Sequence, residues 1–307
     1  MGAVTVVDWL LDSDPAIRWQ VMRDLTREPA GVAAAERSRV ASEGWGARLL
    51  ALQGPDGYWA GGSLFPEWTS TTHTLLVLRY MGLDPTSAQA RRAVALVRDN
   101  VKWDHAGQAY FSGEVEPCIN GKAVAIGSYF GQDVSGIVDR LLGEQLGDGG
   151  WNCEAERGST RSSFNSTIDV LEGLMEYERS VEASPRVTAA RQKAEAYLLD
   201  RHMFRRLSTG AVVNPAWLQF SFPPRYLYDV LRGLDYLRSA GVEPDERAAE
   251  AIDLVKSKRA SDGRWPLENP HPGAVYFDMD EGEGKPSRWN TLRAMRVLDW
   301  YQRGPVR

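Results

Sequence analysis

A seven-residue pattern that recurs three times constrains the fold of this chain more than any other feature. The copies share one spacing, Gln-x-x-Asp-Gly-x-Trp with Arg replacing Gln in the last, and they run over Gln53–Trp59, Gln145–Trp151 and Arg259–Trp265. Asp-Gly is turn chemistry, because Asp bonds the backbone ahead of it and Gly accepts a positive φ. The tryptophan leaves that turn in a fixed direction and can pack between neighbouring helices. The pattern therefore predicts three equivalent corners.

The spacing of the copies indicates a repeated two-helix unit. They lie roughly 100 residues apart, about twice the length of one helical hairpin, so a degenerate copy is expected in each gap. The candidates are Gly107–Phe111 and the stretch around Gly210. A period of roughly 50 residues is typical of a repeated helical hairpin.

Helical periodicity fills the intervals between the corners. Six segments are apolar on more than one face, as expected of helices buried on both sides. These inner segments are approximately Pro15–Leu25, Ser70–Met81, Cys118–Phe130, Ser163–Tyr177, Tyr226–Leu237 and Arg288–Tyr301. The more polar outer segments are approximately Ala33–Leu52, Ser87–Asn100, Val134–Leu146, Pro185–Asp200 and Pro244–Lys258. Segments with the alternating pattern of a β-strand are few, so we predict an all-α fold. Residues 1–307 are expected to form one domain, a single (α/α)₆ toroid of inner and outer helices.

Charge and composition limit the partners and the setting of the chain. The net charge of −5 is mild and mixed in sign, and no basic stripe or arm points to a nucleic-acid partner. No apolar run of about 18 residues predicts a transmembrane helix. Met1–Leu11 is apolar but carries Asp8 and no basic start, which is unlike a signal peptide. Two cysteines fit a reducing compartment, so we expect a cytoplasmic protein, with its oligomeric state left open.

The repeat resembles the QW motif of squalene–hopene cyclases, and a similar turn recurs in the β subunits of protein prenyltransferases. This resemblance extends over nearly the whole chain through the repeat, and it is more specific for fold than for activity. It implies an α-α toroid whose central cavity is lined by aromatic residues and holds an isoprenoid. In the cyclases an acid protonates the isoprenoid and aromatic faces stabilise the cation, whereas the prenyltransferases use zinc to activate a thiol.

Class II cyclases carry their acid in an Asp-x-Asp-Asp pattern, and the nearest match here begins at Asp278. Its carboxylates are Asp278, Asp280 and Glu281, where Glu departs from the family pattern. Clustered carboxylates raise one another's pKa, so one of the three is a candidate catalytic proton donor. The alternative is a solvated acidic loop, because the segment runs into Gly282.

A weaker resemblance concerns metal binding. Glu116-Pro117-Cys118 is similar to the Asp-x-Cys motif of prenyltransferases, but the matching histidine is missing. His73 and Cys153 are the residues that would complete a different zinc site with Glu116 and Cys118. No metal or other cofactor is favoured, because buried thiols and a satisfied histidine explain the same residues.

Aromatic and polar residues near the predicted helix starts are candidates for ligand binding. Arg161 and Arg288, together with helix N-termini, would suit a diphosphate or a carboxylate. Helix capping and core packing are the structural alternatives. The binding candidates are Trp68, His73, Tyr110, Arg161, Phe164, Asn165, Tyr228, Tyr276, Arg288 and Trp289.

Three functions therefore remain open at the level of sequence. The first is an isoprenoid-handling protein, cyclase-like or prenyltransferase-like, with an apolar aromatic cavity. The second is a non-catalytic binder of an apolar small molecule on the same fold. The third is a carbohydrate-active (α/α)₆ enzyme that uses two carboxylates as acid and base.

Overall fold

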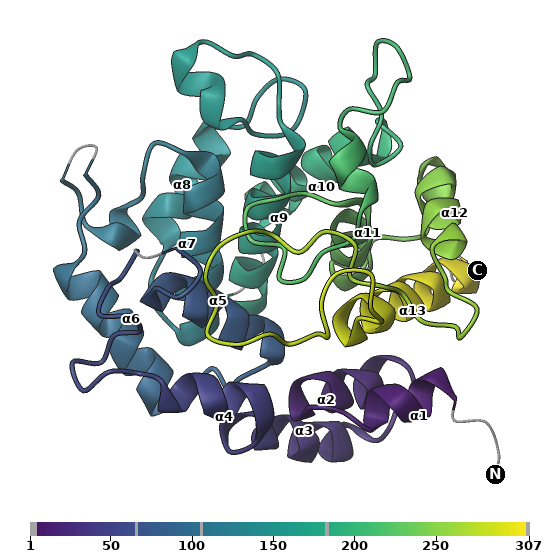
Figure 1. Ribbon diagram of the computed structural model, residues 1–307. Helices are drawn as coiled ribbons and strands as arrows, with labels where there is room; N and C mark the ends of the chain where they lie inside the picture. The colour runs from purple at the N-terminus through teal and green to yellow at the C-terminus, as the bar shows by residue number, and fades with distance from the viewer. Residues whose placement is uncertain (1–4, 65–66, 105–106, 182–183, 305–307) are drawn as a thin grey trace.

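Helices and their connections make up the computed structural model, which describes residues 5–64, 67–104, 107–181 and 184–304 (Figure 1). Within these ranges extended segments pair only in isolated β-bridges, so the predicted all-α class is confirmed. The α-helices are α1 (Val6–Leu11), α2 (Pro15–Asp24), α3 (Ala30–Ser38), α4 (Gly44–Ala51), α5 (Thr71–Met81), α6 (Ala88–Asn100), α7 (Pro117–Phe130), α8 (Ser135–Gly143), α9 (Phe164–Ser180), α10 (Pro185–Leu199), α11 (Val230–Ser239), α12 (Ala249–Ser257) and α13 (Arg288–Arg303).

Six of these helices contact one another in a closed cycle. The order is α2, α5, α7, α9, α11 and α13, and α13 returns to α2. Helices α3, α4, α6, α8, α10 and α12 pack against members of this inner ring (Figure 1). Among the described residues, no helix combines the length and the hydropathy needed to cross a bilayer.

The three repeat corners each join the end of an outer helix to the start of an inner one. In the first, the buried Trp59 donates its indole N–H to the carbonyl of Leu49 in α4 (2.7 Å) and its backbone N–H to Thr71 Oγ1 in α5 (3.0 Å). The equivalent bonds run from Trp151 to Leu141 and Thr167, and from Trp265 to Val255 and Thr291. Each tryptophan therefore fixes one helix end against the next helix start.

The Arg of the third copy replaces Gln without loss of its hydrogen bond. Gln53 Nε2 donates to the carbonyl of Gly57 (2.7 Å), and Arg259 Nε donates to the carbonyl of Gly263 (3.2 Å). Gly57 has a φ of 87°, in the left-handed region that glycine occupies without a steric cost. The residue types at these positions therefore follow from the geometry of the turn.

Several helix boundaries differ from the prediction, and two of these differences have a clear side-chain cause. The outer helix predicted over 33–52 is broken, because Gly44 has a φ of 64° and Trp45 donates its backbone N–H to Asp14 Oδ2 (2.6 Å). The inner helix predicted from Tyr226 begins at Val230 instead, where the Asp229 side chain accepts the backbone N–H of Arg232. In both places a side-chain cap sets the boundary, which helical periodicity does not reveal.

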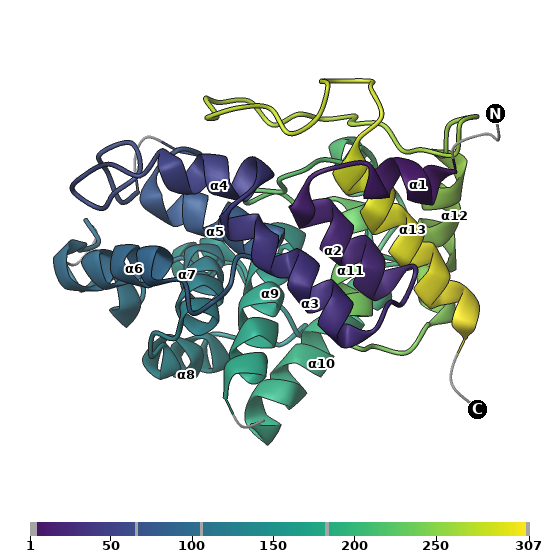
Figure 2. The same cartoon turned by 90° about the horizontal axis from the view of Figure 1, so that it is seen from below.

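A long segment between α12 and α13 crosses one mouth of the ring. Residues 267–287 of this segment, the strap, pass in front of the ring in Figure 1 and above it in Figure 2. The strap is held by the Tyr276 hydroxyl, which donates to the carbonyl of Thr69 (2.9 Å), and by the Ser221 hydroxyl, which donates to the carbonyl of Asn269 (2.5 Å). The strap therefore roofs the centre of the ring.

Candidate functional site

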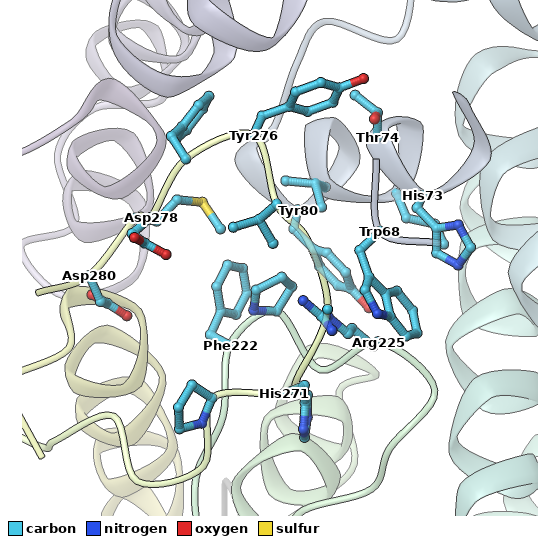
Figure 3. A pocket seen from close by; sticks show the side chains of 18 of the residues that line it. Trp68, His73, Thr74, Tyr80, Phe222, Arg225, His271, Tyr276, Asp278 and Asp280 are labelled. Atoms are coloured by element: carbon cyan, nitrogen blue, oxygen red, sulfur yellow. The ribbon is translucent and has the colours of Figure 1, made fainter. Parts of the chain in front are cut away.

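A pocket of about 240 Å³ lies beneath the strap (Figure 3). One wall is the inner helix α5, which contributes His73, Val77 and Tyr80, and the loop before α11 contributes Phe222. The strap supplies the roof, including Tyr276. We call this cavity the strap pocket.

Aromatic rings make much of the wall of the strap pocket. Tyr80 meets Phe222 edge to face, with ring centroids 5.8 Å apart, and Phe222 stacks on Trp289 at 4.0 Å. Trp68 packs edge to face on His73 at 4.9 Å. Such faces carry negative quadrupole charge and attract cations in a desolvated site.

Carboxylates lie along one side of the strap pocket, where Figure 3 places Asp278 and Asp280. Asp280 accepts the Ser287 hydroxyl (2.7 Å) and the backbone N–H of Arg288 (3.0 Å), so its carboxyl sits at the N-terminus of α13. Burial nevertheless raises the pKa of Asp280 above its usual value, against the opposing effect of these hydrogen bonds. Asp278 is exposed at the rim, and Glu281 is exposed and does not line the pocket.

Basic residues also line the pocket, at His73, Lys122, Arg225 and His271, and Figure 3 places His73 and Arg225 across from the carboxylates. Burial, with the charges of Lys122 and Arg225, lowers the pKa of His73 to about 4, so its ring is neutral at pH 7. His73 Nδ1 lies 2.8 Å from the Ser70 hydroxyl, while the buried Nε2 has no hydrogen-bond partner in the part of the chain that the structure describes. Burial also lowers the pKa of Arg225 to about 10. The strap pocket therefore has carboxylates on one side and, on the other, the cationic side chains Lys122 and Arg225 beside neutral histidines.

The remaining binding candidates are spread through the structure. Tyr110 lines a neighbouring cavity of about 720 Å³, to which His73 also belongs. Phe164 and Tyr228 pack together in the core with ring centroids 5.1 Å apart, and Asn165 Oδ1 accepts the backbone N–H of Tyr228.

Two arginines and one tryptophan of the candidate set also lie outside the strap pocket. Arg161 is exposed, and Arg288 donates to the carbonyl of Trp9 and covers its ring. Trp289 lines a cavity at the opposite mouth of the ring. Of the ten binding candidates, Trp68, His73 and Tyr276 therefore line the strap pocket, together with Asp278 and Asp280 of the acidic candidates.

The metal candidates come together only in part. Among the described residues, the ligand atoms of Glu116, Cys118 and Cys153 lie within 4.8 Å of one another, and His73 is not in this group. The two Sγ atoms are 2.9 Å apart, whereas two thiolates on one tetrahedral zinc lie roughly 3.7 Å apart. The hydrogen bond between them raises the pKa of Cys118 and lowers that of Cys153. As they stand, these residues fit a thiol pair rather than a zinc site.

Several residues of the pocket were not among the sequence candidates. Lys122 is the one that the sequence could have identified as a site residue, because it is the charged residue in an otherwise uncharged inner helix. It lies 3.0 Å from Asp169 and over the ring of Tyr226. Arg225 and His271 come from loops, and no local pattern predicts that those loops meet.

The sequence matches no protein-family model and no curated protein. The structure is similar to solved structures of the type II terpene cyclase MstE from Scytonema, at 16% sequence identity. The apo form of that enzyme gives a TM-score of 0.43, and the match covers 93% of this chain and 86% of that chain. Two variants in complex with the substrate geranylgeranyl dihydroxybenzoate give TM-scores of 0.42 and 0.44, each covering 92% of this chain and 84% of that chain.

Proposed function

We propose that the strap pocket binds an apolar, isoprenoid-class small molecule and that Asp280 donates a proton to it. The observation that carries this proposal is a partly buried carboxyl with a raised pKa at the edge of a pocket walled by aromatic rings. An alkene offers no lone pair to a proton donor, so its protonation needs a carboxyl that keeps its proton, is oriented towards the double bond and is shielded from water.

The aromatic wall has a role in the same chemistry. Protonation of a double bond leaves a carbocation, which the faces of Tyr80, Phe222 and Trp68 would stabilise. The polar end of the ligand would lie at the basic side, near Arg225 and His271. The acidic and basic sides would therefore fix which end of the molecule meets Asp280.

A second candidate function is binding without catalysis. It is favoured by the two hydrogen bonds that Asp280 accepts at the start of α13, which give this carboxyl a structural reason to be present. The carbohydrate alternative is not proposed, because glycosidases place two carboxyl groups on opposite sides of the scissile bond. Here Asp278 and Asp280 lie on the same segment and the same side of the pocket.

The decisive experiment compares turnover of polyprenyl substrates by the wild-type chain and Asp280→Asn. Asparagine keeps an oxygen acceptor for the backbone N–H of Arg288 but cannot act as the acid, so we expect at least a roughly 100-fold loss of kcat with little loss of binding. Asp278→Asn and Glu281→Gln test the other two acidic candidates in parallel. Asp253→Asn, an exposed carboxylate on α12, is the matched control.

Binding is measured separately from turnover. Native mass spectrometry of the purified chain detects a co-purifying apolar ligand, and Trp68→Ala is expected to weaken its retention. Retained ligand with no turnover in the wild type selects the non-catalytic function. Full turnover by Asp280→Asn removes the acid assignment.

A further inference from the structure

A second large cavity, of about 570 Å³, lies at the mouth of the ring opposite the strap. Residues near the C-terminal ends of inner helices line this cavity, such as Arg79 of α5 and Arg179 of α9. In Figure 2 the strap is at the top, and the yellow helix α13 descends from it towards this opposite face. Eight arginines and four carboxylates line the cavity, which we call the arginine chamber.

The carboxylates of the arginine chamber are shared between arginines. Glu176 accepts from Arg79 Nε (3.0 Å) and lies 4.0 Å from Arg179. Asp235 accepts from Arg238 (3.1 Å) and Arg296 (2.7 Å). Asp169 and Asp229, outside the lining, pair with Arg232 and Arg293, so among the described residues eight guanidinium groups are set against six carboxylates and positive charge stays in excess.

Individual arginines show this excess directly. Arg37 donates to two uncharged acceptors, the carbonyl of Gly82 and the hydroxyl of Tyr129, both at 2.8 Å. The Arg79 side chain is only 7% exposed, and its buried Nη1 has no hydrogen-bond partner among the described residues. A buried charged donor without an acceptor is costly, so the chamber holds a donor that an added anion would satisfy.

Carboxylates raise the pKa of Arg79 and Arg296, but two other arginines of the lining show the opposite shift. Burial, together with the charges of Arg79 and Arg23, lowers the pKa of Arg179 despite the presence of Glu176. Burial and the charge of Arg296 lower the pKa of Arg238 in the same way. These guanidinium groups repel one another, and an anion among them would relieve that repulsion.

We propose that the arginine chamber is a binding site for a phosphate-class anion, either inorganic diphosphate or the phosphate group of an organic ligand. Guanidinium groups bind phosphate oxygens in a bidentate manner, and several converging on one cavity favour an anion of two or more charges over a single carboxylate. This site is distinct from the strap pocket, although Tyr80 and Phe222 line both cavities and separate them. The proposal does not depend on the isoprenoid function.

The test is calorimetric titration of the full chain with sodium diphosphate and orthophosphate at constant ionic strength. We expect saturable binding that is tighter for diphosphate, and at least a roughly ten-fold weakening in Arg79→Gln and in Arg37→Gln. Arg186→Gln is the matched control, because it removes the same charge from a side chain that is 74% exposed, in the first turn of α10 and outside the chamber lining. Arg37→Gln is included because Arg37 donates to no carboxylate of the chamber. Its replacement therefore leaves no buried carboxylate without its partner, and this variant is expected to fold.

The outcomes separate the proposal from its rivals. No saturable binding, or an equal loss in Arg186→Gln, overturns the site and leaves the arginines as a structural ion-pair network. Binding of an alkyl diphosphate much tighter than that of inorganic diphosphate identifies an organic ligand as the source of the anion, and equal affinities identify the free anion. Because the readout is anion binding, an absence of isoprenoid turnover leaves this result unaffected.

Discussion

The repeat corners allow one test of the folding argument to be made three times in the same molecule. Thr71, Thr167 and Thr291 each accept the backbone N–H of a repeat tryptophan, at 3.0, 3.1 and 3.0 Å. Thr→Val at any of these positions preserves the shape of the side chain and removes that acceptor. The donor left behind is buried, because all three tryptophans are at most 1% exposed.

The size of the effect follows from the unsatisfied donor. A buried N–H without a partner costs about 1–3 kcal/mol, partly offset by the gain in apolar surface of valine. Each single variant is therefore expected to lose about 1–2 kcal/mol of unfolding free energy. Because the three corners share no hydrogen-bond partner, a double variant is expected to lose about the sum of its two single losses, within roughly 0.5 kcal/mol.

Urea unfolding, followed by tryptophan fluorescence and far-ultraviolet circular dichroism, measures these losses. Thr160→Val is the control, because Thr160 is exposed and lies outside the corners. Losses below about 0.5 kcal/mol at all three corners would refute the view that the hydrogen bond, rather than ring packing, fixes the tryptophan. A large loss at one corner alone would show that the copies are not energetically equivalent.

Three further predictions concern other parts of the ring. His73 is buried and neutral, with a pKa of about 4 in the folded state against 6.5 in the unfolded state. The unfolded state therefore binds more protons, and the unfolding free energy falls as the pH drops from about 6.5 towards 4. His73→Gln should reduce this loss by roughly 1–3 kcal/mol, measured by urea unfolding across pH. Mild oxidation should join Cys118 to Cys153 in a disulfide, because their Sγ atoms are already 2.9 Å apart. Thiol titration should then detect neither cysteine, and two reactive thiols after oxidation would contradict the prediction. Gly121→Ala should cost about 1–3 kcal/mol in thermal unfolding, because its Cβ would lie 2.4 Å from the backbone oxygen of Asp169.

The helices were predictable because their signals are local. Apolar periodicity placed α5 at Ser70–Met81, against Thr71–Met81 in the structure, and the Asp-Gly-x-Trp turns marked where outer helices end. Boundaries set by a distant cap were not predictable, as at Gly44, where the partner Asp14 belongs to another helix start. Local pattern therefore defines the elements, and long-range hydrogen bonds adjust their ends.

The sequence pointed to the acidic side of the candidate site and to Trp68, His73 and Tyr276 in its lining, but not to the rest of the opposing wall. Asp278 and Asp280 stand in a recognisable sequence pattern, and the strap carries them over the pocket. The opposing wall depends on Tyr80 and Arg225, which come from a helix and a loop far apart in sequence. No local pattern in either segment indicates that the two are close, because they come together only when the ring closes.

The direction of the inner helices bears on which charged groups each mouth of the ring holds. A helix carries partial positive charge at its N-terminus and partial negative charge at its C-terminus. The Asp280 carboxyl meets the N-terminus of α13 at the strap mouth, whereas Arg79 and Arg179 stand in the last turns of α5 and α9 at the chamber mouth.

Helix dipoles therefore help the chain to hold its arginines together before any anion binds. Partial charges of about half a unit at the helix C-termini lower the electrostatic cost of the guanidinium cluster. They do not provide a hydrogen-bond acceptor for Arg79 Nη1, which stays unpaired within the part of the chain that the structure describes. The dipole thus explains why the cluster is tolerated, and the unpaired donor is the feature that an anion titration of Arg79→Gln addresses.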